Sequence, residues 1–149
     1  MNNGQAAALH GGWNLQTWLQ HLEQQGQVVL GLERVAAVYG RLLPVGLAMP
    51  AVVVGGTNGK GSTVAYLEAI YRSAGYHTGA YFSPHLEHFN ERVVFDGRPV
   101  DDQPLCEAFE QVASAAGETP LTYFEFTTLA VLWLMAHNTV DVALLEVGL

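Results

Sequence analysis

Apolar residues recur along this chain with two different periods, and each period predicts a different kind of element. In the first third of the chain they recur every three or four positions, which predicts two amphipathic helices. The first helix runs from Asn14, a suitable N-cap, to Gly26. Its apolar positions are Leu15, Trp18, Leu19 and Leu22. The second helix presents an apolar side formed by Leu32, Val35, Ala36, Tyr39 and Leu43.

Three short apolar runs predict strands. Residues 51–54 contain three consecutive valines, which suit a strand covered on both faces. A helix over residues 64–71, ending near Gly75, separates this strand from a second one at residues 77–82. Such a strand–helix–strand unit has parallel strands. The last strand is predicted at residues 140–147.

The segment between these strands predicts a hairpin and two helices. Asp96 and Gly97 form a turn signal between extended arms at residues 92–100. A helix follows from Asp101 or Asp102 to near Gly117, and an apolar helix opens at residues 121–128. Together the elements predict an α/β fold with a mostly parallel sheet and flanking helices.

Composition is that of a globular protein and excludes several functions. The chain has 149 residues, enough for one domain with a buried core; 50% are hydrophobic and 13% charged. A net charge of −8 without a basic run argues against a nucleic-acid surface, and no apolar run is long enough to span a membrane. Residues 1–12 read as a frayed end without the features of a signal peptide, and Cys106 is the only cysteine. We therefore expect a soluble, cytoplasmic protein.

A glycine-rich turn after the first strand predicts an anion site. Its glycines let the backbone approach a ligand, and the following helix directs N–H groups and its dipole at one point. Lys60, the only lysine of the chain, adds a full charge, and Ser62 and Thr63 can cap the helix. The run differs from the standard phosphate loop, which has glycine where Val54 stands and Ser or Thr where Gly61 stands. The alternative is an ordinary glycine-rich turn.

Two oxygen-bearing side chains follow the parallel strands at their carboxyl ends, where functional groups gather in such sheets. Ser83 follows the second strand and is expected beside the phosphate loop; alternatively it is a turn hydroxyl ahead of Pro84. Glu146 ends the last apolar strand, a position that serves magnesium in phosphate-loop enzymes, although a helix-capping or ion-paired glutamate remains open. His85 is expected to order the loop, with His88 solvated, because magnesium prefers oxygen ligands.

The start of the apolar helix at residues 121–128 has two interpretations. Thr122 and Glu125 have capping-box spacing, which indicates simply a helix start. Aromatic side chains and a carboxylate at a helix mouth can also stack on a flat heterocycle and hydrogen-bond to it. The aromatic residues here are Tyr123 and Phe124.

Five short strings together resemble a known family. They are Leu-Gly-Leu-Glu-Arg-Val at 30–35, Thr-Asn-Gly-Lys-Gly-Ser-Thr at 57–63, Ser-Pro-His-Leu at 83–86 with Asn-Glu-Arg-Val at 90–93, Thr-Tyr-Phe-Glu at 122–125 and Glu-Val-Gly-Leu at 146–149. In the residues of these strings and in their order, the chain resembles the folate branch of the Mur ligase superfamily, the dihydrofolate synthase/folylpolyglutamate synthases. The string at 122–125 favours the bifunctional bacterial type.

The resemblance implies a site for ATP, Mg²⁺ and a pterin substrate. ATP would be held by Gly56, Thr57, Asn58, Gly59, Lys60, Gly61, Ser62 and Thr63, with Lys60 in the catalytic role. Magnesium would be held by Ser83 and Glu146. Dihydropteroate or folate would contact Thr122, Tyr123, Phe124 and Glu125, and more weakly by analogy Leu22, Glu23, Gln24 and Gln25. Such enzymes phosphorylate a substrate carboxylate and form an amide with L-glutamate.

The resemblance also implies that residues 13–149 are the first part of a truncated Mur-type ATP-binding domain. The rest of that domain and a glutamate-ligase domain would lie outside this chain, which we expect to bind ATP weakly and to form no amide. The partners would be small molecules, without nucleic acid or membrane, and the full-length enzyme a monomer. Two alternatives stay open: another phosphate-loop enzyme, such as a different Mur-type ligase or a small-molecule kinase, and a non-catalytic nucleotide-binding fragment.

Overall fold

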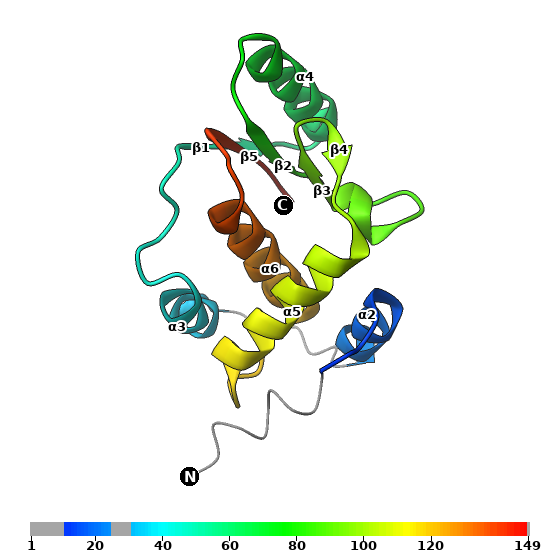
Figure 1. Ribbon diagram of the computed structural model, residues 1–149, viewed down its shortest axis with the longest axis vertical. Helices are drawn as coiled ribbons and strands as arrows, with labels where there is room; N and C mark the ends of the chain where they lie inside the picture. The colour runs from blue at the N-terminus through cyan, green and yellow to red at the C-terminus, as the bar shows by residue number, and fades with distance from the viewer. Residues whose placement is uncertain (1–10, 25–30, 149) are drawn as a thin grey trace. The chain divides into compact units, whose positions relative to one another are not determined.

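The computed structural model describes residues 11–24 and 31–148, and the chain forms two compact units. Each unit combines two separate stretches of sequence. The first comprises Met1–Gly46 and Asp102–Leu134, and the second Leu47–Asp101 and Met135–Leu149. The elements of both units are labelled in Figure 1.

The first unit is helical. It contains α2 (Leu15–Gln24), α3 (Glu33–Leu42), α5 (Asp102–Ala116) and the part of α6 (Tyr123–His137) that runs to Leu134. Asn14 caps α2 as predicted, since its Oδ1 accepts hydrogen bonds of 2.9 Å from both the backbone N–H and the hydroxyl of Thr17. Trp18, Phe109 and Phe126 pack together with ring centroids 5.7 to 6.0 Å apart. This aromatic cluster joins α2, α5 and α6.

The apolar side predicted for α3 is partly wrong. Leu32, just before the helix, is 77% exposed, and Ala36 is exposed as well. Val38 is instead fully buried, with Leu43 buried just beyond the helix. The buried face therefore includes Val38, which the predicted side omits, and α3 is in contact with α5.

The second unit is built on a five-stranded sheet with the order β1-β5-β2-β3-β4. Its strands are β1 (Ala51–Gly55), β2 (Thr78–Tyr81), β3 (Val93–Phe95), β4 (Arg98–Pro99) and β5 (Val142–Val147). β5 pairs in parallel with both β1 and β2, whereas β2–β3 and β3–β4 are antiparallel. The sheet is mixed, with a parallel half as predicted. The sequence did not indicate that β5 inserts between β1 and β2.

Helix α4 (Lys60–Ser73) covers one face of the parallel half. Val64 of α4 packs with Ala80, Val142 and Leu144 in a buried cluster. β1 lies at the edge of the described sheet, and Val53 is 60% exposed. The expectation that β1 is covered on both faces is therefore wrong for this chain, because only Val52 and Val54 pack against that cluster.

The predicted hairpin is present. Asp96 and Gly97 connect β3 to β4 with φ values of 48° and 78°, the left-handed conformation that such two-residue turns require. A short 3₁₀ helix, η1 (Phe89–Arg92), leads into β3. Within the described ranges, no helix combines the length and apolarity needed to cross a membrane.

Candidate functional site

The loop between β1 and α4 presents backbone N–H groups at an exposed turn. Gly59 is the N-cap of α4 with φ of 74°, a conformation that glycine adopts without strain. The N–H groups of the first helical turn have no partner within the helix, and the helix dipole is positive at this end. Residues 57–59 are exposed. The loop therefore has the geometry of an anion site.

The prediction that Ser62 and Thr63 cap this helix is wrong. Both lie inside α4, which begins at Lys60 behind a glycine N-cap without a side-chain cap. The Thr63 hydroxyl donates to the backbone oxygen of Gly59 at 2.9 Å instead. The N–H groups of the first turn thus remain available to a ligand.

Lys60 folds back over its own loop. Its Nζ donates to the backbone oxygen of Gly56 at 2.7 Å, and the side chain is half-buried. Among the described residues, no carboxylate lies within ion-pair distance of Lys60. Its charge is thus placed at the loop without an ion-pair partner in the described part of the chain.

Glu146 and Ser83 meet beside the start of α4. Glu146 is 6% exposed, and its Oε2 accepts a hydrogen bond of 3.0 Å from the Ser83 backbone N–H. A Cβ added to Gly61 would lie 3.5 Å from the same Oε2. The ends of β2 and β5 and the first turn of α4 therefore converge on one point, as the parallel arrangement predicts.

The donor set at this point fits magnesium. A buried carboxylate is costly unless it is paired, yet no cationic side chain in the described part of the chain lies within ion-pair distance of Glu146. Magnesium commonly takes one or two protein oxygen ligands together with phosphates and waters. No cluster of three or more His, Cys, Asp or Glu side chains suited to a metal occurs among the described residues. The Ser83 hydroxyl and the Glu146 carboxylate match the smaller set.

The loop after Ser83 is ordered by His85, as predicted, and by two residues whose role the sequence did not reveal. Arg92 Nε donates to His85 Nδ1 at 2.8 Å, and the guanidinium lies 5.3 Å from the centre of the Phe89 ring. The Glu91 carboxylate accepts the backbone N–H groups of residues 86–88, and these bonds, led by that from His88, lower its pKa. His85 thus orders the loop and His88 is exposed, as predicted. The string at 90–93 was the only signal for Glu91 and Arg92.

In the first unit, Thr122 and Glu125 form the predicted capping box. Glu125 Oε2 accepts the Thr122 N–H at 2.8 Å, and the Thr122 hydroxyl accepts the Glu125 N–H at 3.2 Å. Glu125 also pairs with Arg34 through a contact of 2.8 Å between Oε1 and Nη2. Phe124 is 50% exposed and Tyr123 half-buried.

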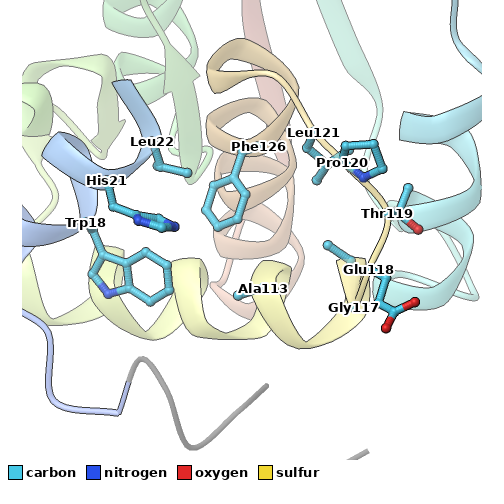
Figure 2. Close-up of a pocket in the computed structure, with 11 residues that line it drawn as sticks. Trp18, His21, Leu22, Ala113, Gly117, Glu118, Thr119, Pro120, Leu121 and Phe126 are labelled. Carbon is cyan, nitrogen blue, oxygen red and sulfur yellow. The ribbon is translucent and has the colours of Figure 1, made fainter. Parts of the chain in front are cut away.

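A cavity of about 250 Å³ lies in the same unit (Figure 2). Leu22 lines it together with Leu121 and Phe126, which flank the string at 122–125. Trp18, His21, Ala113, Ala116, Gly117, Glu118, Thr119 and Pro120 complete the lining. Glu23 and Gln24 are exposed and do not line it, and Gln25 lies outside the described residues. The end of α2 and the start of α6 therefore meet around one cavity, although they are distant in sequence.

Comparisons with known proteins find similar sequences and similar solved structures. No protein-family model matches the chain. It is 44% identical over 140 residues to dihydrofolate synthase/folylpolyglutamate synthase of Escherichia coli, covering 91% of this chain and 32% of the relative. It is 39% identical over 151 residues to the Haemophilus influenzae protein of the same name, covering 100% of this chain and 34% of the relative.

Solved structures give the same result. E. coli FolC in complex with DHPP and ADP superimposes with a TM-score of 0.86 at 42% identity, covering 93% of this chain and 34% of that one. A bifunctional folylpolyglutamate synthase/dihydrofolate synthase with Mn, AMPPNP and L-glutamate bound also gives 0.86, at 42% identity and the same coverage. The chain is therefore homologous to these proteins over most of its length. It spans about a third of the length of each.

Proposed function

We propose that this chain is the ATP-, magnesium- and pterin-binding part of a ligase that adds L-glutamate to dihydropteroate and to folates. The observation that carries the proposal is the convergence of Ser83 and Glu146 on the first turn of α4, beside the phosphate loop. The homologous structures contain ADP, or AMPPNP with Mn, which supports a nucleotide and a divalent metal as ligands of this region. The protein would act in the cytoplasm, and a longer form would be a monomer.

Different residues would bind the nucleotide and the metal. The loop N–H groups and Lys60 would hold the triphosphate of ATP and stabilise the charge that develops on the transferring phosphoryl group. The Ser83 hydroxyl and the Glu146 carboxylate would hold Mg²⁺, which when bound withdraws negative charge from the phosphates. No nucleophilic side chain is required, because a carboxylate oxygen of the substrate bonds to the γ-phosphorus as ADP leaves. The amine of glutamate then forms the amide as phosphate leaves.

The pterin site would lie at the start of α6. Phe124 and Tyr123 offer aromatic surface there, Thr122 and Glu125 hold the turn, and the neighbouring cavity brings Leu22 of α2 to the flanks of the same string. These residues follow the family resemblance, as do Glu23 and Gln24, which are exposed and do not line the cavity. Residues 13–149 would form the first part of the ATP-binding domain.

Two other functions make different predictions. A different phosphate-loop enzyme would bind ATP and magnesium but not dihydropteroate. A non-catalytic nucleotide-binding fragment would bind nucleotide, and a longer form would incorporate no glutamate. The bound ligands of the homologous structures, which include DHPP and L-glutamate, favour the ligase.

Calorimetric titration with ATP, with and without Mg²⁺, tests the nucleotide site. Lys60→Ala should leave the chain folded and weaken ATP binding by roughly 1.5–3 kcal/mol, the usual contribution of hydrogen bonds to a charged group. Arg98→Ala, which removes a positive charge from the exposed strand β4, is the matched control and should change nothing. Equal affinities for the unmodified chain and a folded Lys60→Ala variant would remove Lys60 from the site.

Titration with dihydropteroate tests the pterin site, with tryptophan fluorescence as the readout because Trp18 lines the cavity. Phe124→Ala should weaken dihydropteroate binding and leave ATP binding unchanged, since an exposed ring contributes little to the core. A parallel loss of both affinities, with a lower melting temperature, would show that Phe124 is a structural residue.

A further inference from the structure

Both oxygens of the Glu125 carboxylate are already engaged within the protein. Oε1 accepts from Arg34 Nη2 and Oε2 accepts from the Thr122 backbone N–H, each at 2.8 Å. The two charged side chains are 20% and 13% exposed, so water screens the pair only weakly. A carboxylate held in this way has little freedom to turn towards a ligand.

The three residues connect two helix starts that are distant in sequence. Arg34 lies in the first turn of α3, and Thr122 with Glu125 forms the start of α6. The first turn of α6 carries Phe124 and Tyr123, while Leu121 and Phe126 on either side of the capping box line the cavity. A shift of this turn would therefore displace the exposed ring and the cavity wall together.

We propose that Arg34 and Glu125 are positioning residues of the pterin site, and that Glu125 does not itself recognise the heterocycle. Arg34 holds the Glu125 carboxylate, the carboxylate holds the Thr122 N–H, and the first turn of α6 is thereby fixed. Phe124 and the residues of the cavity wall contact the pterin ring instead. The inference rests on the proposed function for its substrate, whereas the latch formed by Arg34, Glu125 and Thr122 is a property of the chain alone.

A set of four variants separates positioning from contact. Glu125→Gln keeps an oxygen for the Thr122 N–H, because glutamine also serves in capping boxes, whereas Glu125→Ala removes it. Arg34→Met removes the holding charge but keeps much of the side-chain volume. The double variant Arg34→Met/Glu125→Gln removes both charges, so that neither is left buried without a partner. Glu33→Gln, an exposed carboxylate in the same turn of α3, is the matched control.

The first readout is the affinity for dihydropteroate beside the affinity for ATP. Glu125→Ala and Arg34→Met should each weaken dihydropteroate binding by about tenfold to a hundredfold, the range that misplaced groups produce. ATP affinity should stay within about twofold, and the double variant should bind no more weakly than Arg34→Met alone. A Glu125→Gln variant that binds as weakly as Glu125→Ala, or a double variant that binds more weakly than Arg34→Met alone, would assign Glu125 to direct recognition and overturn the proposal.

The second readout needs no substrate. Amide hydrogen exchange at Thr122 in the ligand-free chain should accelerate in Glu125→Ala and Arg34→Met and stay close to the unmodified rate in Glu125→Gln and Glu33→Gln. Unchanged exchange in Arg34→Met would show that Arg34 does not hold the turn. If the unmodified chain binds ATP but no dihydropteroate, the proposed substrate is wrong, and the exchange rates by themselves still decide whether the latch exists.

Discussion

At the scale of single residues, two buried carboxylates of the second unit have opposite surroundings. Glu68 accepts the Thr78 hydroxyl at 3.0 Å and pairs with Arg72 at 3.4 Å. Glu146 is equally buried but has the Ser83 N–H and no cation within ion-pair distance among the described residues. Glu68 is therefore compensated within the described fold, whereas the proposed magnesium would supply the positive charge beside Glu146.

The same substitution should have opposite effects at these two positions. Without metal, Glu146→Gln should raise the free energy of unfolding by about 1 kcal/mol, or roughly 2–4 °C in melting temperature, because it removes an uncompensated charge. Glu68→Gln should lower it, because it leaves Arg72 without its partner. Thermal unfolding with and without Mg²⁺ and ATP measures both effects.

Glu146→Gln should also abolish the gain in ATP affinity that magnesium provides. Ser83→Ala should reduce the same gain, and the two losses should not add, because both side chains would hold one ion. A magnesium effect that survives in Glu146→Gln would exclude this carboxylate as a ligand.

His77 and Asp96 give the second unit a pH-dependent contact. His77 Nδ1 lies 2.8 Å from Asp96 Oδ2, and this hydrogen bond raises the pKa of His77 above 6.5. The same bond, with that from the Thr78 N–H, lowers the pKa of Asp96 below 3.8. The charge of Asp141 also raises the pKa of His77. The charge of Arg72 also lowers the pKa of Asp96. Both groups are therefore charged in the interval between the two shifted values.

The stability of the chain should follow these two titrations. The contribution of His77 is complete below pH 6.5 and is lost as pH rises through its raised pKa. That of Asp96 is complete above pH 3.8 and is lost as pH falls through its lowered pKa. The free energy of unfolding, measured with urea from below pH 3.8 to above the raised pKa of His77, should fall at the alkaline end in the unmodified chain. It should not fall there in His77→Gln or Asp96→Asn. An identical pH profile in all three would contradict the assignment.

At the scale of elements, the sequence correctly predicted several caps and turns that depend only on nearby residues. The Asn14 cap, the Asp96–Gly97 turn and the capping box of Thr122 and Glu125 depend on neighbours within four residues, and all three are present. The meeting of Ser83 with Glu146 followed from one topological rule for parallel strands. These contacts make up much of the second unit's candidate site.

The caps predicted at Ser62 and Thr63 are a local error, because Gly59 is the N-cap. The other errors arose where distant parts of the chain determine the packing. Three valines cannot show whether their strand is central or at an edge, and β5 took the place between β1 and β2. The predicted apolar side of α3 includes Leu32, but Leu32 is exposed and Val38 is buried, and α3 contacts α5, which is distant in sequence. Arg34 lies in the string at 30–35, and nothing in its local sequence indicates a contact with Glu125, which is distant along the chain.

The close packing of β2 provides a test of the sheet. A Cβ at Gly79 would lie 3.3 Å from atoms of Met135, Phe95 and Val140, so neighbours on several sides would have to move. Gly79→Ala should therefore destabilise the chain by about 1–3 kcal/mol. Gly40→Ala makes the same change inside α3 with nothing within 4 Å, and should stabilise by roughly 0.5–1 kcal/mol through helix propensity. Urea unfolding of both variants gives the comparison, and a loss of equal size in both would show that the contacts at Gly79 are not responsible.

At the scale of the whole molecule, the chain combines a helical unit with a unit built on a sheet. The proposed pterin site lies in the first and the proposed nucleotide site in the second. The relatives with this activity are about three times as long as the stretch they share with this chain. The shared stretch thus contains candidate groups for ATP, metal and pterin, and none has been assigned here to glutamate.

We therefore expect the 149-residue chain to bind nucleotide and to form no dihydrofolate by itself. The measurement is incubation with ATP, Mg²⁺, dihydropteroate and labelled L-glutamate, followed by separation of labelled product. A reaction without ATP provides the background. Labelled dihydrofolate above that background would show that these residues suffice for the whole reaction.

The glycine at position 61 has a consequence for how metal binding relates to folding. In the standard phosphate loop, the hydroxyl that serves the metal follows the lysine directly, so one continuous segment supplies both functions. Here Gly61 takes that place and lies against Glu146, and the candidate hydroxyl comes from Ser83 at the end of another strand. The candidate phosphate loop can form from consecutive residues, but the two candidate metal ligands come together only after β2 and β5 have paired. Affinity for magnesium would therefore report on the assembled sheet, whereas affinity for phosphate alone would report on the loop.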